Sequence, residues 1–186
     1  MRLLAVSGSL RAASSNTALL RAAVRLAPAG VTITLTDAVG RLPHFNPELE
    51  ADLPPAARAF RADVDAADGL VFSVPEYAHG VPGSFKNALD WLVGGPEFLN
   101  KPVAFLNASA RGTYALAAVR ETVTVMTGRI SEAGSYTLPM LSGAVTEARI
   151  LGEPELSAGV ARALARFAAE ISASASGRPP YITRES

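Results

Sequence analysis

The sequence contains no cysteine and only two histidines among its 186 residues. The first absence excludes disulfide bonds, thiolate metal sites and a cysteine nucleophile, and it is typical of a protein in a reducing compartment. His44 and His79 stand far apart, and neither has a carboxylate or a histidine at a spacing typical of a metal site. We therefore expect no metal, a cytoplasmic location, and a surface loop around His44.

A surplus of charge of either sign is also absent, because 17 acidic residues balance 17 basic ones and the arginines are scattered. This balance argues against a nucleic acid as a main ligand. No apolar run approaches the roughly 20 residues that a membrane-spanning helix needs, and the chain enters a short apolar run directly after Arg2. We expect neither a nucleic acid nor a membrane as a partner.

What the sequence does contain is an alternation of short apolar runs with helical patterns, which is typical of a parallel sheet covered on both faces. The five expected strands are Leu3–Val6, Val31–Thr36, Gly69–Val74, Pro102–Asn107 and a segment within Ile130–Leu138. The prediction is a single three-layer α/β/α domain over residues 1–173, with a parallel sheet of strand order 2-1-3-4-5. Its last helix is expected over residues 155–173, and residues 174–186 are expected to form a flexible tail.

The first apolar run breaks into a loop of small polar residues just before a helical pattern. Backbone N–H groups at a helix start lack internal partners and carry partial positive charge, so an anion is well placed there. Arg11 adds a charge-assisted donor. Further side-chain donors are available from Ser9, Ser14, Ser15, Asn16 and Thr17. The alternative is a plain polar turn in which Ser15 or Asn16 caps the helix.

Two common nucleotide-binding patterns are missing from this loop. A Walker loop needs Gly-Lys-Ser/Thr at its end and a dinucleotide fingerprint needs three spaced glycines, whereas the loop has only Gly8. A hydroxyl-rich loop with little fixed positive charge suits a single terminal phosphate, such as that of flavin mononucleotide (FMN). A hydrolase is disfavoured, because the chain has neither a cysteine nor a Gly-x-Ser-x-Gly elbow.

Two further loops, Pro75–Gly83 and Ala108–Thr113, follow the third and fourth expected strands. Both carry small polar residues and glycines. Because the carboxyl ends of parallel strands share one edge of a sheet, we expect the three loops to meet at one crevice, beside the switch point between strands 1 and 3. A flavin would lie there, with its phosphate on the first loop and its ring system bordered by the other two.

Several motifs occur in these loops and in the helix after the second one. They are Gly8-Ser9-Leu10-Arg11 with Ser15-Asn16, then Pro75-Glu76-Tyr77, Val81-Pro82-Gly83 and Lys86-Asn87-Ala88-Leu89-Asp90-Trp91. In this order they resemble the NADPH-dependent FMN reductase family, over nearly the whole chain to about Ala173. The resemblance implies a flavodoxin-like fold, bound FMN, and a homodimer or homotetramer. It also implies electron transfer from NADPH or NADH to a small-molecule acceptor such as a quinone, an azo dye, chromate or free flavin.

Position by position, the resemblance assigns cofactor-binding residues in the three loops. Those assigned to the phosphate are Ser9, Arg11, Ser15, Asn16 and Thr17. Those assigned to the ring system are Pro75, Glu76, Tyr77, Ala78, Ser109, Arg111 and Gly112. No side chain is assigned a catalytic role, because FMN carries the hydride chemistry and the protein positions it. For Glu76 and Tyr77 the implied role is mainly through backbone and shape.

Two stretches depart from the pattern of the family. The family commonly has asparagine after the tyrosine and serine two positions further on, where this chain has Ala78, His79 and Gly80. A polar contact is then either missing or supplied by His79. The third loop has Ser109, Arg111 and Gly112 in place of the double glycine of many members, which leaves the contacts at the pyrimidine end of the flavin open.

Two residues have alternative interpretations. Arg111 either raises the reduction potential of the flavin, by stabilising the negative charge of the reduced form, or is a solvated residue at a helix start. Trp91 is either a core residue or part of a subunit contact, and we favour the contact because tryptophan is enriched at the centres of interfaces.

The kinetic mechanism follows from a shared binding face. If NAD(P)H and the acceptor use the same open face of the flavin in turn, the kinetics are ping-pong. The alternative is a noncatalytic flavin-binding protein, either an electron carrier or a redox sensor. The balanced charge argues against a carrier, because such carriers typically bind their partners through an acidic surface.

Overall fold

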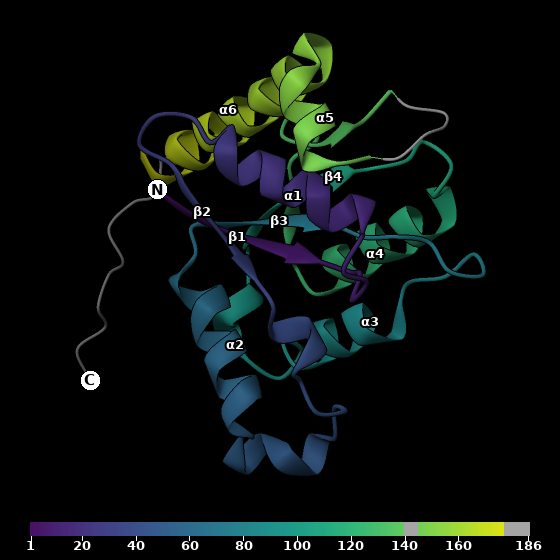
Figure 1. Ribbon diagram of the computed structural model, residues 1–186. Coiled ribbons are helices and arrows are strands. Elements are labelled where there is room, and N and C mark those ends of the chain that lie inside the picture. The colour runs from purple at the N-terminus through teal and green to yellow at the C-terminus, as the bar shows by residue number, and fades with distance from the viewer. Residues whose placement is uncertain (140–144, 177–186) are drawn as a thin grey trace.

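A parallel sheet between two layers of helices forms the centre of the molecule in the computed structural model, which describes residues 1–139 and 145–176 (Figure 1). The strands are β1 Arg2–Ser7, β2 Thr32–Thr36, β3 Gly69–Ser73, β4 Pro102–Asn107, β5 Arg129–Ile130 and β6 Tyr136–Thr137. They lie in the order β2-β1-β3-β4-β5, and β6 also pairs with β4. Because all of these pairings are parallel, the predicted α/β fold with strand order 2-1-3-4-5 is confirmed.

The fifth expected strand consists of two short strands, and in this respect the prediction was wrong. β5 and β6 both pair with β4, and the residues between them form a turn. The Ser131 hydroxyl accepts a hydrogen bond from the Gly134 N–H at 2.9 Å and stabilises this turn. The Ser135 hydroxyl accepts from the Phe105 N–H at 3.0 Å, so a side chain supplies the partner that β4 would otherwise lack here.

Helices cover both faces of the sheet. Their bounds are α1 Ser15–Arg25, α2 Pro55–Ala66, α3 Gly83–Asp90, α4 Thr113–Val125, α5 Glu147–Gly152 and α6 Pro154–Ser176. Figure 1 shows α1, α5 and α6 on one face and α2, α3 and α4 on the other. None of the helices in the described part of the chain is long and apolar enough to cross a bilayer.

The end of the chain differs in two ways from the expectation. α5 was not expected, because a helix of six residues is too short to show a clear apolar period. α6 continues to Ser176, three residues beyond the expected end at Ala173. The rest of the expected tail, residues 177–186, lies outside the described residues.

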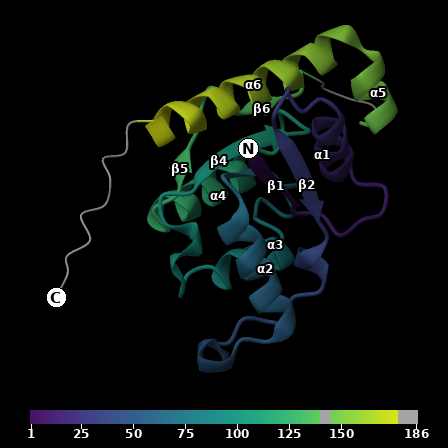
Figure 2. The same cartoon turned by 90° about the vertical axis from the view of Figure 1, so that its left-hand side faces the viewer.

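Apolar side chains fill the space on both faces of the sheet. Along β1, Leu3 and Ala5 pack into the core that α1 and α6 cover, whereas Leu4 and Val6 pack into the core that α2, α3 and α4 cover. Figure 2 shows the long α6 lying across the first of these faces. Burying one such leucine contributes about 1.5–3 kcal/mol to stability. The two cores hold the strands in place, so the loops at the carboxyl edge start from fixed positions.

Trp91 is a core residue, so its favoured interpretation as a subunit contact was wrong. The side chain is 0% exposed, and its Nε1–H donates a hydrogen bond to the Pro43 carbonyl at 2.8 Å. The Phe45 ring packs edge-on against the indole, with 5.1 Å between the ring centroids. Trp91 thereby holds the loop after β2 against the end of α3. His44, in the same loop, is exposed as expected.

Candidate functional site

The first and second loops meet at the carboxyl edge of the sheet. β1 and β3 are paired there, with Ser7 opposite Ser73 at their last residues. The Gly8 N–H extends this pairing by donating to the Ser73 carbonyl at 2.8 Å. A Cβ on Gly8 would lie 3.0 Å from Val74 Cγ1 and 3.1 Å from Pro75 Cδ. The first loop therefore passes directly against the second, and only glycine fits at this point without a shift.

Asn16 connects the start of α1 to the end of β3. Its side-chain oxygen accepts a hydrogen bond from the Ser73 hydroxyl at 2.9 Å, and both side chains are buried. Because the amide oxygen is engaged, the Nδ2 group is left as a donor, for which the described residues provide no acceptor.

The residue that caps α1 is Ser14. Its hydroxyl accepts a hydrogen bond from the Thr17 N–H at 3.3 Å, and its extended backbone is typical of a capping position. Neither Ser15 nor Asn16 caps the helix, so both capping residues predicted for the plain-turn alternative were wrong. Ser15 is instead the first helical residue.

Hydroxyl groups shape the first loop. The Ser7 and Thr17 hydroxyl oxygens lie 2.8 Å apart and share a hydrogen bond. Ser7 Oγ also accepts from the Ser9 N–H at 3.2 Å, and Ser9 Oγ accepts from the Arg11 N–H at 3.3 Å. The Ser9 hydroxyl only accepts in these contacts, so its own proton remains available to a ligand.

Several donors at the start of α1 have no protein partner. Within the described residues, the N–H groups of Ser15 and Asn16 have no acceptor, as expected in the first turn of a helix. The exposed Arg11 guanidinium likewise has no acceptor in this part of the chain. Together with the Asn16 amide, these groups form a set of donors suited to a phosphate.

The second loop closes in a tight turn between Tyr77 and Gly80. Their backbone groups exchange two hydrogen bonds, of 3.1 and 2.9 Å. Ala78 and His79 occupy the two central positions, with φ of 49° and 58°. Asparagine adopts this left-handed conformation more readily than alanine, because its side chain can bond locally. The turn therefore forms despite the departure at Ala78, at a cost in backbone strain.

Bonds between side chains and backbone also shape the third loop. Asn107 Oδ1 accepts from the Ser109 N–H at 3.3 Å, and Ser109 Oγ accepts from the Arg111 N–H at 3.1 Å. The Arg111 side chain is exposed, and its guanidinium has no acceptor in residues 1–139 or 145–176. Arg111 is therefore available to an anionic group, which is compatible with both of its interpretations.

Glu76 joins the second loop to the helix that follows the third. Its Oε2 accepts hydrogen bonds from the Tyr114 and Ala115 N–H groups, at 2.8 and 3.0 Å. The His79 ring stacks on the Tyr114 ring, with centroids 4.3 Å apart and planes 20° from parallel. A Cβ on Gly112 would lie 3.5 Å from the Glu76 Cβ, so the backbone at Gly112 passes close to the Glu76 side chain.

All of the predicted cofactor-binding residues lie in these three loops or in the first turn of α1. Ser7 and Ser73 were not expected, although both are polar residues at the end of otherwise apolar strands, and that pattern was visible in the sequence. The side-chain role of Glu76 was also missed. Its partners follow it by 38 and 39 residues, so no local pattern could reveal it.

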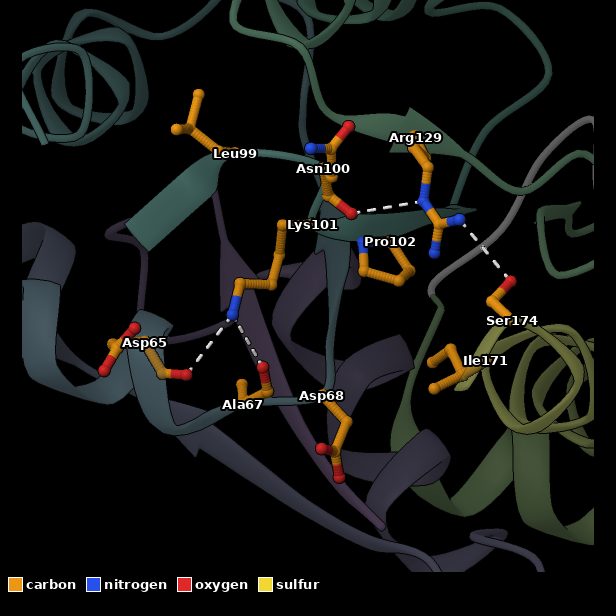
Figure 3. Close-up of a pocket in the computed structure, with 10 residues that line it drawn as sticks. All are labelled: Asp65, Ala67, Asp68, Leu99, Asn100, Lys101, Pro102, Arg129, Ile171 and Ser174. Carbon is orange, nitrogen blue, oxygen red and sulfur yellow. Dashed lines mark hydrogen bonds between the residues drawn. The ribbon is translucent and has the colours of Figure 1, made fainter. Parts of the chain in front are cut away.

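A hollow of about 530 Å³ at the opposite, amino edge of the sheet contains none of these residues (Figure 3). Lys101 Nζ donates there to the carbonyls of Asp65 and Ala67, at 3.3 and 2.8 Å. Arg129 Nε donates to the Asn100 carbonyl at 3.1 Å. Burial lowers the pKa of Lys101. Because protein carbonyls already engage both cations, this hollow is a weaker candidate for a ligand site.

Comparison with known proteins gives a family and several relatives. The family described as NADPH-dependent FMN reductase matches residues 1–142, so the match ends before the expected limit at Ala173. An NAD(P)H-dependent FMN reductase from Pseudomonas aeruginosa is 44% identical over 113 residues, which are 59% of this chain and 60% of that protein. A probable NADPH:quinone oxidoreductase from Oryza sativa is 41% identical over 114 residues, which are 59% of this chain and 56% of that protein. The chain thus spans less than two thirds of the length of these relatives.

A solved structure shares the fold. FerB, a flavoenzyme NAD(P)H:(acceptor) oxidoreductase from Paracoccus denitrificans, superimposes with a TM-score of 0.71 and 22% sequence identity. The superposition covers 92% of this chain and 97% of that one. At this identity the likeness establishes the flavodoxin-like architecture, and the chemistry has to be argued from the loops.

Proposed function

Because the chain belongs to the NADPH-dependent FMN reductase family, we propose that it binds FMN at the carboxyl edge of its sheet and passes electrons from NAD(P)H to a small acceptor. The observation that carries this proposal is the set of donors without protein partners at the start of α1. The bond from Ser73 to Asn16 is central to it, because it leaves the Asn16 amide hydrogens to donate. A terminal phosphate is the anion that such a set suits.

The residues that would hold FMN fall into two groups. The phosphate group would contact Ser9, Arg11, Ser15, Asn16 and Thr17. The ring system would contact Pro75, Glu76, Tyr77, Ala78, Ser109, Arg111 and Gly112. When bound, FMN supplies the hydride chemistry, so the protein needs to position it and leave one face open. We assign no catalytic side chain.

The acceptor is proposed from chemistry and from the relatives. An open flavin face makes few demands on an acceptor, which suits quinones, azo dyes, chromate or free flavin. NADPH and NADH are both candidate donors, since the loops hold no dinucleotide fingerprint from which a contact to the 2′-phosphate could be inferred. Donor and acceptor would occupy the same space in turn. Parallel initial-rate lines are therefore expected, and convergent lines would contradict a shared face.

We also propose a homodimer or homotetramer. Three apolar side chains, Val93, Leu99 and Val125, are 63%, 56% and 72% exposed. They line a groove of about 450 Å³ that also involves α3 and α4. Exposed apolar surface of this kind is typical of a protein–protein contact. Sedimentation velocity of the purified chain tests this, and a monomer at all concentrations would exclude it.

The test of the function is an anaerobic spectrum. The purified protein is reconstituted with FMN, desalted, and measured before and after addition of NADPH. Retained flavin that bleaches promptly supports the reductase. Retained flavin that stays oxidised favours the alternative, an electron carrier or redox sensor, and loss of the flavin on desalting contradicts the proposed cofactor.

A further inference from the structure

We propose that Glu76 is a positioning residue of the flavin ring site, which acts by fixing the start of α4 against the second loop. This inference rests on the proposed binding of FMN. Glu76 lies directly before the Tyr77–Gly80 turn, yet its carboxylate binds backbone groups of another element.

The start of α4 depends on Glu76 because the helix has no capping side chain of its own. Its capping position is Gly112, which makes no side-chain hydrogen bond. The carboxylate of Glu76 takes over this role by accepting from the Tyr114 and Ala115 N–H groups. A negative charge at a helix N-terminus is also favoured by the helix dipole.

Two further contacts tie the same two segments together. The His79 ring stacks on Tyr114, and the backbone at Gly112 passes so close to Glu76 that a Cβ there would lie 3.5 Å from the Glu76 Cβ. The rings are exposed, whereas Glu76 is half-buried. We infer that the carboxylate is the main link and that without it the second and third loops would no longer hold one fixed separation.

The role predicts a specific pattern of affinities. The carboxylate of Glu76 makes its hydrogen bonds to α4, and within the described residues it makes no hydrogen bond or ion pair to the first loop, which holds the proposed phosphate donors. Glu76→Ala is therefore expected to weaken FMN and riboflavin by the same factor, about tenfold for the loss of hydrogen bonds to a charged group. Loss of a phosphate donor instead weakens FMN alone.

The experiment combines hydrogen exchange of the free protein with titrations of both flavins. In Glu76→Ala, the Tyr114 and Ala115 amides are expected to exchange about tenfold faster. Glu76→Gln keeps an oxygen acceptor of the same length and is expected to restore most of both effects. Glu121→Ala, which removes an exposed carboxylate from the same helix, serves as the matched control and is expected to change neither.

Each contrary result is distinct. Faster exchange with unchanged affinity for both flavins would reduce Glu76 to a helix cap and overturn its positioning role. A loss of FMN affinity without a loss of riboflavin affinity would also overturn it. Failure of the proposed function appears earlier, as a wild-type protein that binds neither flavin, whereas failure of this inference appears only in the variants.

Discussion

The two edges of the sheet both carry arginine and other donors, but the edges differ in whether these donors are hydrogen-bonded to the protein itself. At the amino edge, Lys101 and Arg129 donate to backbone carbonyls of the protein itself. At the carboxyl edge, the Arg11 and Arg111 guanidinium groups have no acceptor among the described residues. Within the same residues, the Asn16 side-chain amide and the first two N–H groups of α1 also lack protein acceptors at this edge, so it is a better candidate for an anion site than the hollow at the amino edge.

The largest expected effect comes from the glycine at which two loops meet. Gly8→Ala places a Cβ about 3 Å from Val74 and Pro75, so the first and second loops must separate. We expect a loss of about 1–3 kcal/mol in the free energy of unfolding, which is typical of overpacking, together with a loss of FMN affinity. Urea unfolding and a flavin titration measure the two quantities.

Gly83→Ala is the matched control for this prediction. Gly83 is exposed at the start of α3, and a Cβ there would meet nothing within 4 Å. This variant is expected to be neutral or to gain about 0.4–1 kcal/mol, with unchanged FMN affinity. Equal effects of the two substitutions would show that the close approach at Gly8 is unimportant.

Substituting one arginine at each edge of the sheet tests which edge binds the FMN phosphate. Arg11→Ala should weaken FMN about tenfold and leave riboflavin unchanged, because it removes a charge-assisted donor from the proposed phosphate site. Arg129→Ala should change neither affinity, because this arginine contacts Asn100 and Ser174 at the far edge. Isothermal titration with both flavins gives the ratio, and an Arg129 effect on FMN would reverse the assignment.

A smaller effect is expected at the third loop. If Arg111 stabilises the negative charge of reduced flavin, Arg111→Ala should lower the midpoint potential by about 30 mV, which is a tenfold change for a two-electron couple. Anaerobic equilibration with a reference dye measures the potential. An unchanged value would leave Arg111 as a solvated residue at a helix start.

The smallest effect belongs to the amino edge and depends on pH. Burial lowers the pKa of Lys101 below its ordinary value of 10.5. At a pH between the lowered pKa of the folded protein and the ordinary value of 10.5, Lys101 is protonated in the unfolded chain and deprotonated in the folded protein. The free energy of unfolding therefore rises with pH in this window.

Lys101→Met removes this contribution. The stability of the variant relative to the wild type should therefore fall as the pH rises toward 10.5, while FMN affinity at neutral pH stays the same. Urea unfolding at a series of pH values from neutral to 10.5 measures the difference. A difference independent of pH would mean that burial does not set the titration of Lys101.

The regular parts of the fold were predictable because they depend on local patterns. Pro102–Asn107 was predicted with the bounds of β4, and the other apolar runs matched their strands to within about a residue or two at each end. The prediction of a single fifth strand was wrong because the Ser131 hydroxyl stabilises a turn and the Ser135 hydroxyl bonds to a backbone N–H of β4, and serine hydroxyl groups carry no strand signal. The prediction for Trp91 was wrong because the sequence pattern of a tryptophan on an apolar helix is the same whether a neighbouring loop or another subunit covers it.

The sequence predicted which loops leave the carboxyl edge of the sheet, but it did not predict the contacts within them. The loops were identified because strand ends in a parallel sheet share an edge. The capping residue of α1 could not be predicted, because Ser14, Ser15 and Asn16 are adjacent and are all good capping residues. The links from Asn16 to Ser73 and from Glu76 to Tyr114 join residues 57 and 38 positions apart, and only the folded sheet brings them together.

Hydrogen–deuterium exchange with and without FMN tests most directly whether the carboxyl edge is the site. FMN is expected to protect amides in residues 8–17, 75–80 and 108–113, and to leave residues 65–68, 99–102 and 129 at the amino edge unchanged. Protection confined to the amino edge, or no protection at either edge, would contradict the assignment of the site.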